Sequence, residues 1–323
     1  MNKPLIFLFR FLRKKYTKRA PGRTALPRPA CEKNTDEASR LIYEQLTSDS
    51  PCMIARFGDV ELLTTVNYQY IQKKEKDLIG YIKGEHPEWW WDPFLVKRMR
   101  RNAGFFSNDK ENLSRFCRIL IEKMPLVDIL GSWIPSEVYF EKELENARKV
   151  DLYTLDPYFA TQPWTRALAG KKVLVVHPFA ETIRTQYAKR KHLFANPDIL
   201  PDFELKTIKA VQSIGGNDNG FKTWFDALNS MQKQIDSEDY DICLLGCGAY
   251  GFLLAAHVKE QGKKAFHLGG ALQLLFGIRG ARWEDPAYHP QYPYYTLMNE
   301  YWVRAGEKER PAAAKQVEGG CYW

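Results

Sequence analysis

The 323-residue sequence has no hydrophobic run long enough to cross a membrane. The apolar segment PLIFLF near the start begins at Pro4, is followed by Arg10, and lacks the small-residue cleavage site of a signal peptide. The six cysteines are scattered and do not form two pairs with zinc-ligand spacing. These absences argue against a membrane-spanning protein, a secreted disulfide scaffold and a zinc domain, and they favour a cytoplasmic globular protein.

Acidic residues are missing from the first 30 positions, which contain nine Lys or Arg. Because the whole chain carries +8 and this segment +9, the remainder carries about −1. A surface for nucleic acid is therefore not expected on the body. We predict that residues 1–30 are a basic amphipathic tail and linker, of which residues 1–20 lie on the anionic inner face of the plasma membrane. A disordered or trimmed tail is the alternative.

Short apolar segments alternate with helical segments in residues 31–323, which we expect to form a single α/β domain. Strands are expected at residues 52–56, 126–130, 151–155, 172–176, 204–208, 241–245 and 264–268. The alternation is typical of a doubly wound, mostly parallel, Rossmann-like sheet with helices on both faces. After about residue 282 the chain is irregular and aromatic, so we expect a C-terminal wrap over the body.

A glycine-rich loop follows the apolar segment DICLL. Gly246, Gly248 and Gly251 have the spacing of a dinucleotide-binding fingerprint. Such a site also needs an acidic residue after the next strand, yet no Asp or Glu occurs between Glu260 and Glu284. A dehydrogenase is thus disfavoured. Two interpretations stay open: the loop brings backbone N–H groups close to a phosphate or sugar, or its glycines serve only a tight turn.

The segment RFGDVE follows the expected strand at residues 52–56. If the chain stays extended here, Asp59 and Glu61 point to the same side. Two converging carboxylates are stable when a cation neutralises them, and oxygen ligands favour Mg²⁺ or Mn²⁺. We therefore predict that these two acids hold a metal ion and a diphosphate, with Arg56 pairing with a phosphate. The alternative is a helix that begins here with acids in its first turn.

The RFGDVE loop resembles the DxE loop of GT-D-type bacterial glycosyltransferases. Three further segments are similar to proteins of this group encoded with surface-polysaccharide genes: VVHPFAETIRTQYAKRKHLF, LLGCGAYGFLLAAHVKEQGKKAFHLGGALQLLFGIRGARW and the terminal EGGCYW. Together the similar segments cover most of residues 36–323. The resemblance implies a Rossmann-like fold, a nucleotide-diphosphate sugar as donor and a divalent cation at Asp59 and Glu61.

Other candidate residues are inferred from loops and helix starts. Glu181, in the first turn of an expected helix, is a candidate general base, although it would equally suit the helix dipole. The N–H groups of that helix start are candidates to bind a phosphate or sugar. The predicted donor-binding residues are Arg56, Phe57, Gly58, His177, Pro178, Phe179, Thr182, Gln186, Tyr187, Gly246, Gly248, Tyr250, Arg279 and Arg282.

Three adjacent tryptophans, Trp89, Trp90 and Trp91, form either an aromatic platform for an acceptor or a lid packed on the body. Taken together, the residues predict a glycosyltransferase with Mn²⁺ or Mg²⁺ as cofactor. Its donor would be a nucleotide-diphosphate sugar, with UDP favoured, and its acceptor a hydroxyl of a surface glycan or a lipid-linked saccharide. A non-catalytic nucleotide- or glycan-binding module and a metal-dependent phosphoester hydrolase are the alternatives. Whether the chain forms a homo-oligomer is left open.

Overall fold

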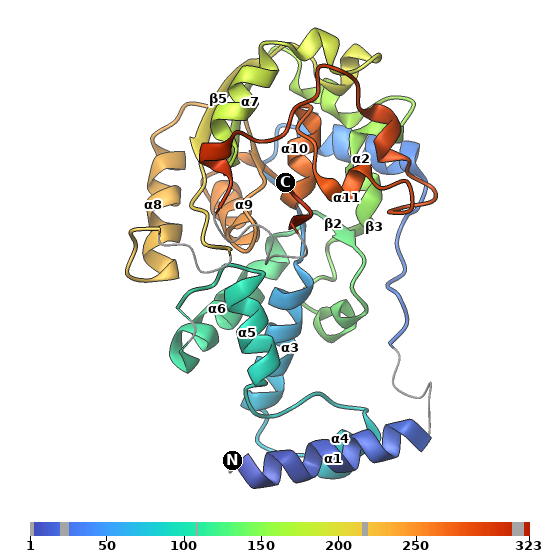
Figure 1. Ribbon diagram of the computed structural model, residues 1–323, viewed down its shortest axis with the longest axis vertical. Coiled ribbons are helices and arrows are strands. Elements are labelled where there is room, and N and C mark those ends of the chain that lie inside the picture. The colour runs from blue at the N-terminus through green and yellow to red at the C-terminus, as the bar shows by residue number, and fades with distance from the viewer. Residues whose placement is uncertain (1–2, 20–25, 108, 215–218, 312–319) are drawn as a thin grey trace.

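The computed structural model describes residues 3–19, 26–107, 109–214, 219–311 and 320–323. Within these residues, seven parallel strands form one sheet in the order β3-β2-β1-β7-β6-β4-β5. Helices surround this sheet (Figure 1). The strands are β1 (Cys52–Arg56), β2 (Ile129–Ser132), β3 (Arg148–Asp151), β4 (Lys172–His177), β5 (Glu204–Lys209), β6 (Ile242–Leu245) and β7 (Lys264–His267). The predicted doubly wound, Rossmann-like α/β class is confirmed.

Side chains of the central strands alternate between two buried faces of the sheet. On one face, Met53 and Ala55 pack in a core with helices α3 (Asp59–Gln72), α6 (Lys110–Lys123), α8 (Trp224–Asp236) and α9 (Tyr250–Glu260). On the other, Cys52 and Ile54 pack with α2 (Thr35–Thr47), α7 (Ala180–Tyr187), α10 (Leu272–Leu275) and α11 (Ala281–Glu284). The continuous apolar character of strands such as CMIAR follows from this burial on both sides.

The predicted strand at residues 151–155 is wrong. The strand lies earlier, at Arg148–Asp151, and Leu152–Leu155 form a turn of 3-10 helix. The side chain of Asp151 accepts the Tyr153 N–H at 3.0 Å, which turns the chain at the end of the strand. The strand expected at 126–130 is also displaced toward the C-terminus, whereas the other five lie within one residue of their predicted ends.

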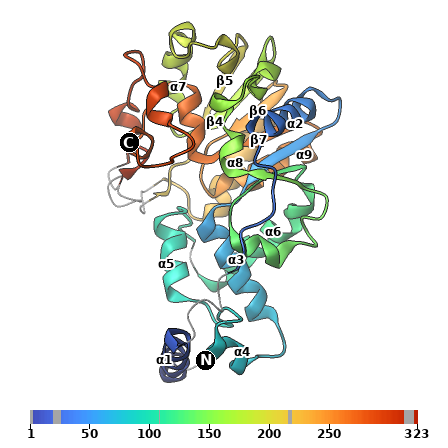
Figure 2. The same ribbon diagram turned by 90° about the vertical axis from the view of Figure 1, so that its right-hand side faces the viewer.

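Two helices, α1 (Lys3–Arg19) and α4 (Leu78–Lys83), lie at one end of the molecule, beyond the sheet (Figures 1 and 2). Helix α5 (Pro93–Arg101) packs along α3 between this end and the sheet. Among the described residues, no helix combines the length and the apolar character needed to cross a bilayer. Residues 1, 2 and 20–25 of the predicted tail and linker lie outside the described residues.

The three adjacent tryptophans form packing contacts at this end. Trp90 is buried, and both Trp89 and Trp90 meet the ring of Tyr81 edge-on. Trp91 stacks on Tyr68 of α3. These contacts favour the packed-lid interpretation, because aromatic pairs of this geometry stabilise the fold.

Candidate functional site

A cavity of about 550 Å³ opens at the carboxyl ends of the central strands. Its walls include Arg56, His177 and His267, which end β1, β4 and β7, together with Gly246 directly after β6. The carboxyl ends of parallel strands meet at one edge of a sheet, and ligands of doubly wound folds bind there. Most of the predicted site residues therefore lie at the carboxyl-end edge of the sheet, where ligands of such folds bind.

Asp59 and Glu61 both line this cavity, but the extended geometry predicted for them is wrong. Helix α3 begins at Asp59 with Gly58 as its N-cap, so both acids belong to its first turn, where the helix dipole favours them. A Cβ atom on Gly58 would lie 2.1 Å from Glu61 Oε2. The Glu61 carboxylate thus folds back over the N-cap residue, and glycine leaves the room for it.

Three arginines share the cavity with these two acids. Arg98, in α5, donates from Nη2 to Asp59 Oδ2 at 2.6 Å. Arg56 lies over the ring of Trp133, 5.2 Å from its centroid, and Arg282 also lines the wall. Three positive charges against two negative ones give the described lining a positive excess, which suits an anionic ligand.

Two histidines of the lining are buried and neutral. Burial lowers the pKa of His177 to about 3, and burial with the nearby charge of Arg56 lowers the pKa of His267 to about 3. His177 Nδ1 accepts the Phe179 N–H at 3.0 Å, which orients the ring. The positive charge in the cavity near neutral pH therefore comes from the arginines.

The glycine loop shapes this cavity through close packing. A Cβ atom on Gly246 would lie 2.5 Å from Cδ2 of His177, and one on Gly251 would lie 2.2 Å from the His267 ring. Gly248 has φ +57°, a left-handed conformation that favours glycine. Turn geometry and packing thus account for the spacing, and Gly246 and Gly248 are also placed to meet a ligand.

The N-terminus of α7 already has a partner. Glu309, from the C-terminal wrap, accepts the N–H groups of Glu181 and Thr182 at 2.8 and 3.3 Å, and also the Thr182 hydroxyl. The phosphate or sugar site predicted at this helix start is wrong, because a carboxylate of the chain satisfies these donors. Glu181 and Thr182 line a separate hollow and are not part of the large cavity.

Four other predicted donor-binding residues lie outside the cavity lining. They are Phe57, Gln186, Tyr187 and Arg279. Phe57 is buried and stacks on a core phenylalanine with ring centroids 4.7 Å apart. Gln186 and Arg279 donate to carbonyl oxygens near the C-terminal wrap, and the Tyr187 hydroxyl bonds to the backbone before β5. These side chains hold the fold together.

Eleven predicted residues do line the cavity: Arg56, Gly58, Asp59, Glu61, His177, Pro178, Phe179, Gly246, Gly248, Tyr250 and Arg282. The sequence reasoning missed others, among them Arg98, Asn102, Trp133, Gln212, Ser213, His267, Gln273, Tyr288 and Tyr322. Trp133 and Ser213 come soon after β2 and β5, so the rule that ligands bind at strand ends would have found them if applied to every strand. Arg98 lies within a helix and gives no such signal.

The divalent cation predicted at Asp59 and Glu61 stays a prediction, because both carboxylates line the cavity but residues two apart on a helix do not face each other. Within the described parts of the chain, no group of three or more His, Cys, Asp or Glu side chains is placed to hold a metal ion. Asp59 and Glu61 offer oxygen ligands of the kind that Mg²⁺ and Mn²⁺ prefer, and Mg²⁺ is often held by one or two carboxylates plus substrate phosphates. Because Arg98 occupies one Asp59 oxygen, we expect weak cation binding without a diphosphate.

Comparisons of this chain with protein-family models, with curated proteins and with solved structures find no match. The functional assignment therefore depends on the geometry and chemistry of the cavity.

Proposed function

We propose that this protein is a metal-dependent glycosyltransferase. It moves a sugar from a nucleotide-diphosphate donor, with UDP as the favoured carrier, to a hydroxyl of a surface glycan or a lipid-linked saccharide. The observation that carries the proposal is the meeting of Asp59 and Glu61 with three arginines in one cavity at the strand ends. The volume of about 550 Å³ is of the size that small-molecule ligands occupy.

Each part of the lining has a task in this reaction. Asp59 and Glu61 would hold a divalent cation, which would offset the charge on the departing diphosphate. Arg56 and Arg282 pair with phosphate oxygens, for which the planar guanidinium is well suited. Trp133 and the tyrosines of the lining present aromatic surface to a base or sugar ring.

The test is the release of UDP from a panel of UDP-sugars with Mn²⁺, with and without saccharide acceptors. Asp59→Asn and Glu61→Gln are each expected to abolish transfer while the protein stays folded. Glu111→Gln is the matched control, because Glu111 is an exposed acid in the first turn of α6, outside the cavity. Full turnover by both cavity variants contradicts the proposal.

The same assay separates the alternatives. Nucleotide binding without consumption of any donor supports a non-catalytic binding module. Hydrolysis of unrelated phosphoesters, lost in the same two variants, supports a metal-dependent hydrolase, which the two carboxylates would serve equally.

A further inference from the structure

One face of α1 exposes an apolar stripe. Phe7, Leu8 and Phe11 are 75%, 46% and 54% exposed, and exposed Pro4 extends the stripe. These positions lie on one side of the helix, since residues three and four apart are neighbours. The same face continues into exposed lysines at positions 14, 15 and 18.

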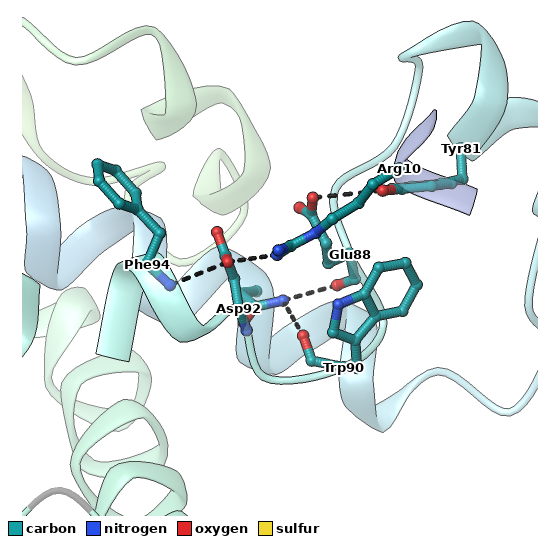
Figure 3. Close-up of polar contacts among 7 residues, drawn as sticks. Arg10, Tyr81, Glu88, Trp90, Asp92 and Phe94 are labelled. Carbon is teal, nitrogen blue, oxygen red and sulfur yellow. Dashed lines mark hydrogen bonds and ion pairs between the residues drawn. The ribbon is translucent and has the colours of Figure 1, made fainter. Parts of the chain in front are cut away.

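The opposite face of α1 attaches the helix to the body largely through charged side chains. Arg10 Nη2 lies 2.5 Å from Asp92 Oδ1 (Figure 3), and Arg13 donates to a backbone carbonyl of the loop after α4 at 2.6 Å. Phe9 contacts Trp89 with ring centroids 6.1 Å apart. An amphipathic helix on a protein in water normally turns its apolar stripe inward. Here two arginines face the body and two phenylalanines face outward.

This attachment is connected to the core. Asp92 Oδ1 also accepts the Phe94 N–H at 3.1 Å as the N-cap of α5, and the Asp92 N–H donates to Asn67 Oδ1 at 3.2 Å. Asn67, buried in α3, donates in turn to the carbonyl oxygens of Glu88 and Trp90. The orientation of α1 is therefore set by a network that reaches α3.

Other large apolar side chains are exposed on the elements next to α1. Helix α4 packs beside α1 at the same end of the molecule (Figures 1 and 2). Leu78 and Ile79 at its start are 37% and 67% exposed, and Phe94 at the start of α5 is 65% exposed. Large apolar side chains gathered in this way mark an interaction surface.

We propose that α1 and α4 form a docking platform for an anionic lipid bilayer, with α1 lying in the plane of the headgroups. Lys14, Lys15 and Lys18 are exposed on the free face of α1, and residues 1–30 contain no acid, which complements anionic lipid. A second copy of this chain is the poorer occupant, because it would set like charges against each other. The 17 residues of α1 extend about 25 Å and carry both apolar and basic groups on the free face, as interfacial helices do.

The platform is coupled to the cavity through α5. Its N-cap Asp92 is bound by Arg10 of α1, and Arg98 near its other end is bound to Asp59. Docking would therefore fix the cavity at a set height above the bilayer. The docking inference does not depend on the proposed glycosyl transfer, since it follows from the surface alone.

The test is co-sedimentation of the full chain with vesicles, without nucleotide or metal. Phosphatidylcholine vesicles containing about 30% phosphatidylserine are compared with pure phosphatidylcholine, at low and high salt. We expect binding to the anionic vesicles that falls with salt. The double variant Phe7→Ser, Phe11→Ser is expected to bind about a hundredfold more weakly, as two phenylalanines no longer enter the lipid. Val138→Ser with Tyr295→Ser is the matched control, because these exposed side chains lie outside α1 and α4.

Each contrary outcome overturns the inference. Failure of the wild type to bind anionic vesicles does so directly, as does equal binding by the wild type and the phenylalanine variant. Equal binding to neutral and anionic vesicles contradicts the role of the basic residues. A solution dimer that the phenylalanine variant converts to a monomer, measured by light scattering, would assign the stripe to a second copy. Because no sugar donor is present, none of these results bears on the proposed transfer.

Discussion

Arg98 Nη2 lies 2.6 Å from Asp59 Oδ2, and this ion pair joins α5 to the first turn of α3 at the cavity wall. Both side chains are partly exposed to solvent, so the pair contributes at most about 1 kcal/mol to stability. Its importance lies in its position. Arg98 holds an oxygen that a cation would otherwise use, and it adds positive charge where a diphosphate would bind.

Arg98→Gln is expected to change the two affinities in opposite directions. Mn²⁺ alone should bind more tightly, because Asp59 is released. UDP without metal should bind about tenfold more weakly, or about 1.4 kcal/mol, because the cavity loses one of its three positive charges. Isothermal titration measures both. Arg100→Gln, an exposed residue of the same helix outside the cavity, is the control. If both affinities of the Arg98 variant match the wild type, the pair is merely structural.

The fold was predictable because each strand is indicated by a pattern within a few neighbouring residues. Segments such as CMIAR and KVLVV are short, apolar and flanked by polar residues, which is what strands buried on both faces require. The site was predictable where it depended on strand ends, as for Arg56, His177 and Gly246. The parallel topology brings these loops together, whatever the details of each side chain.

The prediction of site residues was wrong or incomplete where a side chain or helix end bonds to a residue far away in the sequence. The N–H groups at the start of α7 were expected to meet a ligand, but Glu309 reaches them from 128 residues along the chain. Arg98 pairs with Asp59 across 39 residues, and nothing local distinguishes it from the other basic residues of α5. Hydrogen-bond partners this far apart are set by tertiary packing, which periodicity does not report.

We expect Asp156 to make the stability of the protein depend on pH. It is buried beside the cavity wall, the Tyr294 hydroxyl donates to its Oδ2, and burial raises its pKa to about 7. The folded state therefore keeps a proton that the unfolded chain releases near pH 4. Stability should fall between about pH 4 and 7 by about 1.4 kcal/mol per pH unit from this group, and the loss is complete above its folded pKa.

Asp156→Asn removes this titration while keeping an oxygen for Tyr294. The free energy of unfolding of the variant relative to wild type should rise through the same pH range and become constant above about pH 8. Urea unfolding at a series of pH values measures the difference. The contributions of His177 and His267, which destabilise the fold as the pH drops below their unfolded pKa, are common to both proteins and cancel. If the free energy of unfolding changes with pH in the same way in the two proteins, Asp156 is already ionised in the folded state over this pH range.

The glycine loop offers two substitutions with different physical costs. Gly246→Ala should be destabilising by about 1–3 kcal/mol through overpacking, because its Cβ would meet His177 and the Gly269 carbonyl oxygen. Gly248→Ala meets open space, so its cost is the left-handed backbone alone, about 1 kcal/mol. Gly246→Ala should also reduce UDP binding, since it displaces a ring of the cavity wall. Equal losses of stability in the two variants would refute the packing explanation.

Glu309 secures the C-terminal wrap to α7, and its charge matters as much as its shape. Its carboxylate accepts two backbone N–H groups and one hydroxyl at the positive end of the α7 dipole. Glu309→Gln keeps the acceptor oxygen but loses the charge and one acceptor, so we expect a loss of about 1–2 kcal/mol in the free energy of unfolding. Glu307→Gln is the control, because Glu307 lies exposed in the same turn, where a lost charge costs little.

Inorganic phosphate distinguishes the two interpretations of this helix start. If the start of α7 were a phosphate site, phosphate would stabilise the wild type and Glu309→Gln would strengthen that effect. With Glu309 as the resident partner, phosphate should leave the wild type unchanged at this helix. Limited proteolysis near residue 309 then distinguishes a loosened wrap from a global loss of stability, because only the first exposes this segment at denaturant concentrations where the sheet stays folded.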